Sequence, residues 1–321
     1  MASLREIKDR IGSVRSTLKI TSAMKLVASA KLRKAQKAIE ALRPYERALS
    51  EILAAVGPVR PDVPASRLPS SLSADAETGF GGTNPAVAEA STSGNIGAAV
   101  TGPTAVVAIA SNSSLCGGFN ANVVRKALET IRGCEGEVEV YPLGRKMTDA
   151  LRRAGYTADQ DYNDLVAHPS YEQSSALARR LAERFERGGL ARIVLVYTSF
   201  VSASRQEPVA ETYLPFDGTN GVIPGLTRNL QAPPSSSVDD YILEPDAAAL
   251  AAQLLPQVTL LKFHAAILDS AAAEQAARTL AMQTASDNAE DLLGELTLEY
   301  NKGRQQKITA EILDLLGGAA Q

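Results

Sequence analysis

The chain has 321 residues, of which 45% are hydrophobic but only 5% aromatic, and it contains no Trp. This composition is typical of a folded protein whose core is filled by Ala and Leu, and it favours helical packing over a large β-sandwich. Two cysteines, Cys116 and Cys134, provide neither a disulfide framework nor the ligand spacing of a metal site. The N-terminus lacks the apolar segment of a signal peptide, and no apolar run is long enough to span a membrane. The sequence therefore predicts a soluble protein of a reducing compartment.

The net charge of −3 is distributed unevenly along the chain. Residues 1–57 contain twelve Lys or Arg and five Asp or Glu, so this segment alone has a net charge of +7. Six of its basic residues cluster on one length of the predicted helix: Lys19, Lys25, Lys31, Arg33, Lys34 and Lys37. Such an arm is typical of binding to nucleic acid, anionic lipid or an acidic protein surface, and a solvated helix face has the same pattern. The charge pattern alone leaves these alternatives open.

An apolar heptad runs through residues 4–56 and keeps its phase for eight repeats. One row of the seam is Leu4, Ile11, Leu18, Lys25, Leu32, Ile39, Glu46 and Leu53. The other row is Ile7, Val14, Thr21, Ala28, Ala35, Leu42, Leu49 and Val56. Thirteen of these sixteen residues are apolar, which predicts a coiled-coil helix. Ser3 and Glu6 predict a capping box at its start, Pro44 is a possible bend, and Gly57-Pro58 ends it.

A second helical stripe occupies the end of the chain, where no Pro occurs after Pro256. Apolar residues recur at helical spacing: Leu254, Val258, Leu261, Ala265, Leu268, Ala272, Ala289, Leu293, Leu296, Ile308, Ile312 and Leu315. A helix of this length is on the order of 100 Å long, which is wider than a domain of this size. We expect it to project and to pair with the N-terminal helix in antiparallel fashion; the alternative is that each stripe binds a different protein. The polar seam residues Thr21 and Lys25 predict looser packing beside Met24.

Strands and helices alternate in the middle of the chain. The expected strands are 104–110, 137–141, 192–200 and 208–216, and the expected helices are 120–132, 144–154 and 171–187. This order predicts a Rossmann-like α/β domain with a largely parallel sheet. The segment 58–102 has five Pro, six Gly and six Ser, and it is expected to be a flexible insertion. The predicted organisation is an N-terminal coiled-coil helix at 1–57, the insertion at 58–102, the α/β domain at 103–242 with a second flexible insertion at 217–240, and a C-terminal coiled-coil helix at 243–321.

No catalytic or cofactor motif is evident. The first strand is followed by SNSSLCGGFN, which lacks the spaced glycines of a dinucleotide-binding loop, and the chain has no Walker A sequence. Gly117-Gly118 is expected to form a tight structural turn; the alternative is that their amides bind an anion at the start of the following helix. The chain has two histidines, His168 and His264, and nothing near either of them in the sequence indicates a Ser–His–Asp triad. We therefore expect no catalytic residue, no cofactor and no metal ligand.

Both ends of the chain resemble one protein family. SLREIKDRIGSVRSTLKITSAMKLVASAKLRKAQ at residues 3–36 and ASDNAEDLLGELTLEYNKGRQQKITAEILDLLGGAA at 285–320 are similar to the terminal helices of the gamma subunit of F-type ATP synthases, and SLCGGFN and LGRK agree within the domain. The resemblance implies an antiparallel coiled coil inside a ring of alternating alpha and beta subunits. It places the α/β domain against an epsilon-type subunit and the membrane c-ring. The implied role is the non-catalytic rotor of a proton-translocating ATP synthase, peripheral at the cytoplasmic face of a bacterial inner membrane.

The same resemblance implies which residues contact the beta subunits. Carried over by motif, they are Met24, Lys25, Arg278, Asn301, Arg304, Gln305 and Thr309. The apolar tip, 308–319, is implied to turn in a sleeve at the top of the ring. Two features depart from the family: Asn112, Ser113 and Ser114 replace a charged pair and a glycine before LCGG, and the segments 58–102 and 217–240 are long.

Two other classes of protein fit parts of the sequence. A nucleotide-binding α/β enzyme with helical arms needs a phosphate-binding loop, which the sequence lacks. A basic-helix nucleic-acid binder needs a basic region next to an uninterrupted dimer zipper, whereas here the basic residues flank the seam itself. The sequence therefore favours the rotor, with no nucleic-acid partner.

Overall fold

A computed structural model describes residues 3–56, 102–157, 162–215, 244 and 247–318. The elements are α1 (Leu4–Val56), β1 (Thr104–Ile109), α2 (Phe119–Arg132), β2 (Val138–Leu143), α3 (Arg145–Arg153), α4 (Asn163–Ala167), α5 (Tyr171–Glu186), β3 (Arg192–Phe200), β4 (Gln206–Leu214) and α6 (Ala247–Gly318). Apart from Gly102, the two predicted insertions at 58–102 and 217–240 lie outside the described residues.

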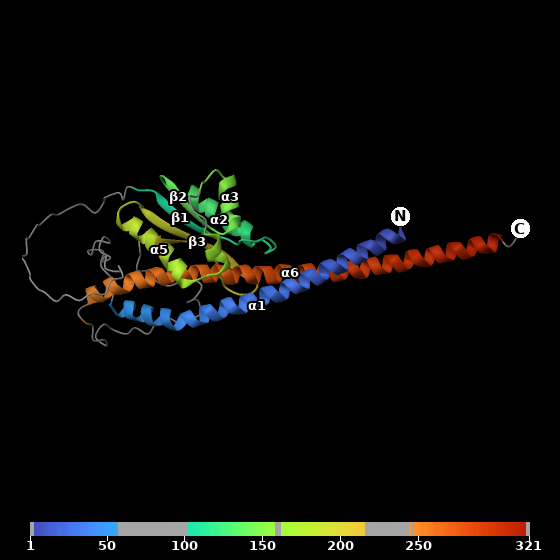
Figure 1. The fold of residues 1–321 in the computed structure, drawn as a ribbon, viewed down its shortest axis with the longest axis horizontal. Helices are drawn as coiled ribbons and strands as arrows, with labels where there is room; N and C mark the ends of the chain where they lie inside the picture. The colour runs from blue at the N-terminus through green and yellow to red at the C-terminus, as the bar shows by residue number, and fades with distance from the viewer. Residues whose placement is uncertain (1–2, 57–101, 158–161, 216–243, 245–246, 319–321) are drawn as a thin grey trace, which may run out of the picture.

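The two terminal helices run antiparallel and form a shaft that projects from the α/β domain (Figure 1). The helix α6 has 72 residues, which corresponds to roughly 110 Å, and its C-terminal end extends past the start of α1. The predicted intramolecular pair is confirmed. The predicted capping box is also present, since the backbone N–H of Glu6 donates to Ser3 Oγ and that of Ser3 to Glu6 Oε2, each at 3.2 Å.

The predicted seam of α1 faces α6. Every seam residue whose side chain is described is buried or half-buried, whereas Ile20, Leu26 and Val27, which lie off the seam, are 57–68% exposed. The register stays constant along the shaft. Leu4 lies against Gly303 near one end, and Leu49 packs with Val258 and Leu261 near the other. The apolar spacing at the two ends of the chain therefore encodes one continuous interface.

The α/β domain contains a four-stranded sheet in the order β2-β1-β3-β4. The strand β1 pairs in parallel with β2 and β3, and β4 pairs antiparallel with β3. The largely parallel sheet is thus confirmed, with one antiparallel edge strand. The fourth strand begins at Gln206, two residues before the predicted start, because its polar first residues continue the ladder opposite Ser199 and Phe200. The short helix α4 was not predicted.

Helices cover both faces of this sheet (Figure 1). On one face, α2 and α3 pack on Val106, Ala108, Val194 and Val196. On the other, α4, α5 and residues 260–267 of α6 pack on alternate residues of β1 and β3. Because the sheet is buried on both faces, its central strands are continuous apolar runs in the sequence. The helix α6 is therefore shared, because it belongs to the core of the domain and to the shaft.

Candidate functional site on the shaft

Four of the predicted contact residues come together on the outer part of α6. Asn301, Arg304, Gln305 and Thr309 are all exposed. Gly303 marks the side of α6 that faces α1, because a Cβ added there would lie 3.0 Å from Cδ2 of Leu4. At about 100° per residue, the four residues fall on the side of the helix away from Gly303. These four polar side chains point away from α1, and we call them the outer face.

The end of α6 continues past the level of Leu4, where the described part of α1 stops (Figure 1). Its apolar side chains are open to solvent: Ile308 is 47% exposed, Ile312 52% and Leu313 62%. Ile308 and Ile312 lie on the same side of the helix as the outer face, by the same angular count. A monomeric protein rarely exposes such a row of large apolar residues without a partner.

Met24 and Lys25 lie on α1, at a different level of the shaft. Both side chains are half-buried. Nearby, the hydroxyls of Thr21 and Ser286 meet inside the seam. Met24 and Lys25 therefore belong to the part of the shaft that leaves the domain. Arg278 is on the same part of α6, and roughly 40 Å of helix separates it from Arg304. The predicted contact residues therefore lie at two levels of the shaft, one beside the domain and one near the tip.

Arg278 differs from the other six because its guanidinium is buried among residues of its own chain. The side chain is 9% exposed, Nη1 lies 2.7 Å from Glu274 Oε1, and Nη2 donates to Ser113 Oγ at 2.7 Å. The sequence shows the i,i+4 spacing to Glu274, but nothing in it indicates Ser113, which is 165 residues away. Arg278 thus ties the loop after β1 to the shaft.

The same loop is fixed on its other side by Asn112. The Asn112 Nδ2 donates to the carbonyl oxygen of Asn163 at 2.7 Å, and Asn112 Oδ1 accepts from the backbone N–H of Arg145 at 2.9 Å. Where the resemblance led us to expect a charged pair and glycine, uncharged side chains therefore make specific contacts within the chain. The loop therefore contacts three helices: the start of α3 at Arg145, the start of α4 at Asn163, and α6 at Arg278.

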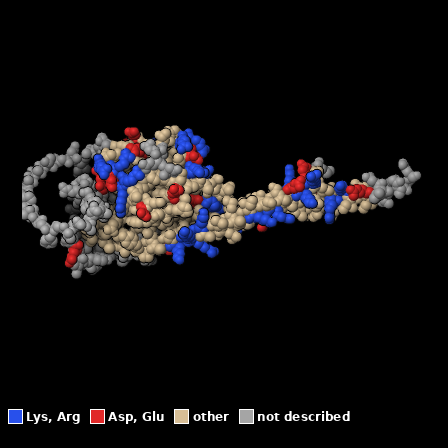
Figure 2. Space-filling model, viewed as in Figure 1, with Lys and Arg blue, Asp and Glu red and all other residues tan. Residues whose placement is uncertain are grey.

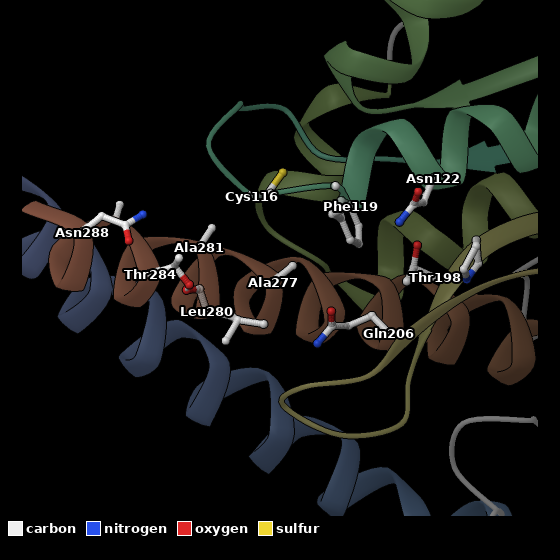
Figure 3. A pocket seen from close by; sticks show the side chains of 14 residues that line it. Cys116, Phe119, Asn122, Thr198, Gln206, Ala277, Leu280, Ala281, Thr284 and Asn288 are labelled. Atoms are coloured by element: carbon white, nitrogen blue, oxygen red, sulfur yellow. The ribbon is translucent and has the colours of Figure 1, made fainter.

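A cavity of about 510 Å³ lies between this loop and α6 (Figure 3). Gly117, with φ +57°, and Gly118, at the N-cap of α2, form its rim, so the predicted tight turn is present. The residues around it include Cys116, Phe119, Asn122, Thr198, Gln206, Leu280, Thr284 and Asn288. None of the lining side chains is acidic, basic or an imidazole, so the cavity offers no charged group to hold phosphates and no general base.

The buried imidazole of His264 lies between α6 and α5. Its Nδ1 is 2.8 Å from the hydroxyl oxygen of Ser174, and its ring meets the ring of Tyr171 edge to face at 5.4 Å. Burial lowers the pKa of His264, so the neutral form is favoured. The arrangement is a polar contact within the domain core. Among the described residues, no group of three or more His, Cys, Asp or Glu could hold a metal ion.

Basic side chains gather on α1. No Asp or Glu occurs between residues 10 and 39, and Lys19, Lys31, Arg33, Lys34 and Lys37 are exposed. Figure 2 shows Lys and Arg along the shaft and beside the domain. No helix in the described part of the chain has the length and hydropathy needed to cross a membrane.

Comparisons with known proteins agree with a shaft of this kind. The model of a family described as ATP synthase matches residues 3–321. The ATP synthase gamma chain of Bacteroides fragilis (strain YCH46) is 43% identical over 99% of both chains, and that of Bacteroides thetaiotaomicron is 42% identical over the full length of both. A structure of the Euglena gracilis mitochondrial ATP synthase, OSCP/F1/c-ring, contains a similar fold, with a TM-score of 0.58 at 18% identity, covering 99% of this chain and 93% of that one.

The chain therefore belongs to the ATP synthase gamma chain family. Its two relatives from Bacteroides have nearly the same length, so the segments 58–102 and 217–240 do not make this chain longer than they are. Neither the nucleotide-binding enzyme nor the basic-helix nucleic-acid binder is supported by these comparisons.

Proposed function

We propose that the chain is the central rotor stalk of an ATP synthase and carries no catalytic site itself. Its partners are the alpha and beta subunits around the shaft, and an epsilon-type subunit and the membrane c-ring at the α/β domain. The complex couples the movement of ions, which we take to be protons, to ATP synthesis at the cytoplasmic face of an inner membrane. The observation that carries this proposal is a shaft roughly 110 Å long, built from both ends of a gamma-family chain.

The asymmetry of the shaft is what allows it to act on its partners. The outer face is polar on one side of α6, α1 adds a basic surface, and the domain is attached on one side only. A rotating shaft with different sides presents a different contact to each beta subunit in turn. Only a difference in binding free energy between two beta conformations can shift their populations, and an asymmetric shaft supplies that difference.

The residues of the outer face have the chemistry for this contact. Arg304 presents a planar, permanently charged fork that suits a carboxylate, and its neighbours Asn301, Gln305 and Thr309 add neutral hydrogen-bonding groups. Met24 and Lys25 extend the contact to α1, beside the domain. Arg278 contributes to the contact indirectly, because its hydrogen bond to Ser113 holds the loop after β1 against the shaft.

The test is a double substitution in the assembled complex, Arg304→Ala with Gln305→Ala. A charge-assisted hydrogen bond contributes about 1.5–3 kcal/mol, so its loss lowers ATP turnover or separates it from rotation. The fold is retained because both side chains are exposed. Lys307→Ala is the matched control: Lys307 is also exposed, but it lies about 140° from the centre of the outer face and pairs with Glu311.

Two results would contradict the proposal. One is failure of the chain to co-purify with alpha and beta subunits. The other is ATP hydrolysis by the purified chain alone that is lost in the Arg304→Ala/Gln305→Ala variant.

A further inference from the structure

The contact between α6 and the α/β domain has a polar pair on each side of an apolar strip. The strip consists of Leu260, Phe263, Ala266 and Ile267, all of which belong to the domain core. We propose that the two flanking pairs, Lys262 with Glu211 and His264 with Ser174, fix the rotational setting of α6 about its own axis, so that the domain and the shaft turn as one body. The four are positioning residues.

Burial of the apolar strip alone sets this angle less sharply than a directional polar contact does. Hydrophobic burial is non-directional and follows the area removed from water. A helix that is apolar on most of its surface can therefore roll in its groove with little change in buried area. Between residues 258 and 268, α6 is buried all round, because Leu261, Ala265 and Leu268 face α1 while the strip faces the sheet.

Lys262 and Glu211 supply a directional contact on the first flank. Lys262 is 2% exposed, and its Nζ lies 3.7 Å from Oε1 of Glu211 on β4. The hydroxyl of Tyr197 on β3 donates to the same carboxylate oxygen at 3.4 Å. Burial lowers the pKa of Lys262 and raises the pKa of Glu211, and the charge of each partner opposes this. A roll that separates the Lys262 ammonium from the Glu211 carboxylate weakens their attraction where Lys262 is shielded from water, which is unfavourable.

His264 and Ser174 supply the contact on the opposite flank. Lys262 and His264 are about 200° apart around the helix, with the apolar strip between them. A roll in one sense pulls Lys262 away from β4, and a roll in the other sense pulls His264 away from α5. The hydroxyl of Tyr213 also donates to the carbonyl oxygen of Thr259 at 3.0 Å, which fixes the position of α6 along its axis.

The consequence concerns the transmission of torque. The domain packs on the sheet-facing side of α6, and the outer face lies on the same helix more than 30 residues further on. Any roll of α6 within its groove changes the direction in which the outer face points relative to the domain. A fixed setting therefore matters for the transmission of torque, and this consequence rests on the proposed rotor function.

The test measures the distance between the domain and the shaft by paired spin labels. The labels are placed at Glu129→Cys on α2 and Glu290→Cys on α6, both exposed, in the full chain with Cys134→Ser. In the Lys262→Met/Glu211→Leu variant both charges are replaced by apolar groups, so the fold is kept. A roll of about 30° moves a side chain at the helix surface by roughly 3 Å, so the distance distribution is expected to broaden or shift by up to this amount.

The exposed pair Arg187→Ala/Glu183→Ala at the C-terminal end of α5 is the control, and it leaves the distribution unchanged. A second variant, His264→Leu/Ser174→Ala, tests the other flank and replaces the first if that one unfolds. The inference would be overturned if both variants fold and each has a distance distribution as narrow as that of the parent, at the same distance. The measurement needs no partner subunit, so its outcome is independent of the proposed rotor function.

Discussion

The hydroxyl oxygens of Thr21 on α1 and Ser286 on α6 lie 2.8 Å apart inside the seam. Thr21 is 9% exposed and Ser286 6%. One of the three polar positions in the seam is therefore filled by a hydrogen bond between the two helices. Since a buried hydroxyl without a partner is costly, this pair favours one register of the shaft over its neighbours.

We predict that these two residues are energetically coupled. Ser286→Ala leaves the Thr21 hydroxyl with only its contact to the carbonyl oxygen of Leu18, and we expect a loss of about 0.5–1.5 kcal/mol in the free energy of unfolding. Thr21→Val/Ser286→Ala removes both polar groups and should cost less than the two single changes together. A double-mutant cycle by urea unfolding measures the coupling. Strict additivity would show that the hydrogen bond contributes nothing.

Two glycines should respond in opposite directions to substitution by Ala. Gly294 is inside α6 and nothing lies within 4 Å of an added Cβ, so Gly294→Ala should stabilise the chain by about 0.5–1 kcal/mol through helix propensity. Gly144 has φ +97°, and an added Cβ would clash with the backbone of Ala110, so Gly144→Ala should destabilise it by more than that. Thermal unfolding of both variants decides this, and equal effects would contradict the local geometry.

The pKa of His264 makes stability depend on pH in a defined direction. Burial lowers this pKa below 6.5, so the unfolded chain binds a proton that the folded chain does not. The contribution of His264 is fully present above pH 6.5 and is lost as the pH falls below it. His264→Asn keeps a polar partner for Ser174 but does not titrate. We expect its melting temperature to fall less than that of the parent between pH 7.5 and 5.5; parallel curves would exclude this role.

Removal of α1 should expose the apolar seam of α6. Ala265, Leu268 and Ala272 pack with Ile39 and its neighbours, and a chain that lacks residues 1–50 leaves this surface in water. Aggregation is the expected result, measured by light scattering against the intact chain. A soluble, monomeric product with an unchanged α6 helix would contradict the pairing.

The parts of the fold that follow from local spacing could be predicted from the sequence. The seam rows, the capping box at Ser3 and Glu6, and the strand at Arg192–Phe200 depend on residues that are close in the chain, and the structure confirms them. The seam residues Leu261 and Ala265 were likewise identified from their spacing.

Other features depend on which surfaces meet, and the sequence carries no signal for them. The strip around Phe263 lies between seam residues, so it was hidden inside a helix that is apolar all round. The contact of Arg278 with Ser113 joins residues far apart in the chain. The outer face was located by resemblance alone, because an exposed polar helix surface has the same composition whether or not it binds a partner.

The most direct test of the rotor is to watch it turn. A probe attached at Glu129→Cys on the domain is observed in a complex whose alpha and beta subunits are fixed to a surface. We predict that addition of ATP makes the probe rotate in one direction, and that Arg304→Ala/Gln305→Ala slows or stops this rotation while Lys307→Ala does not. A probe that stays still while the ring hydrolyses ATP would contradict the account.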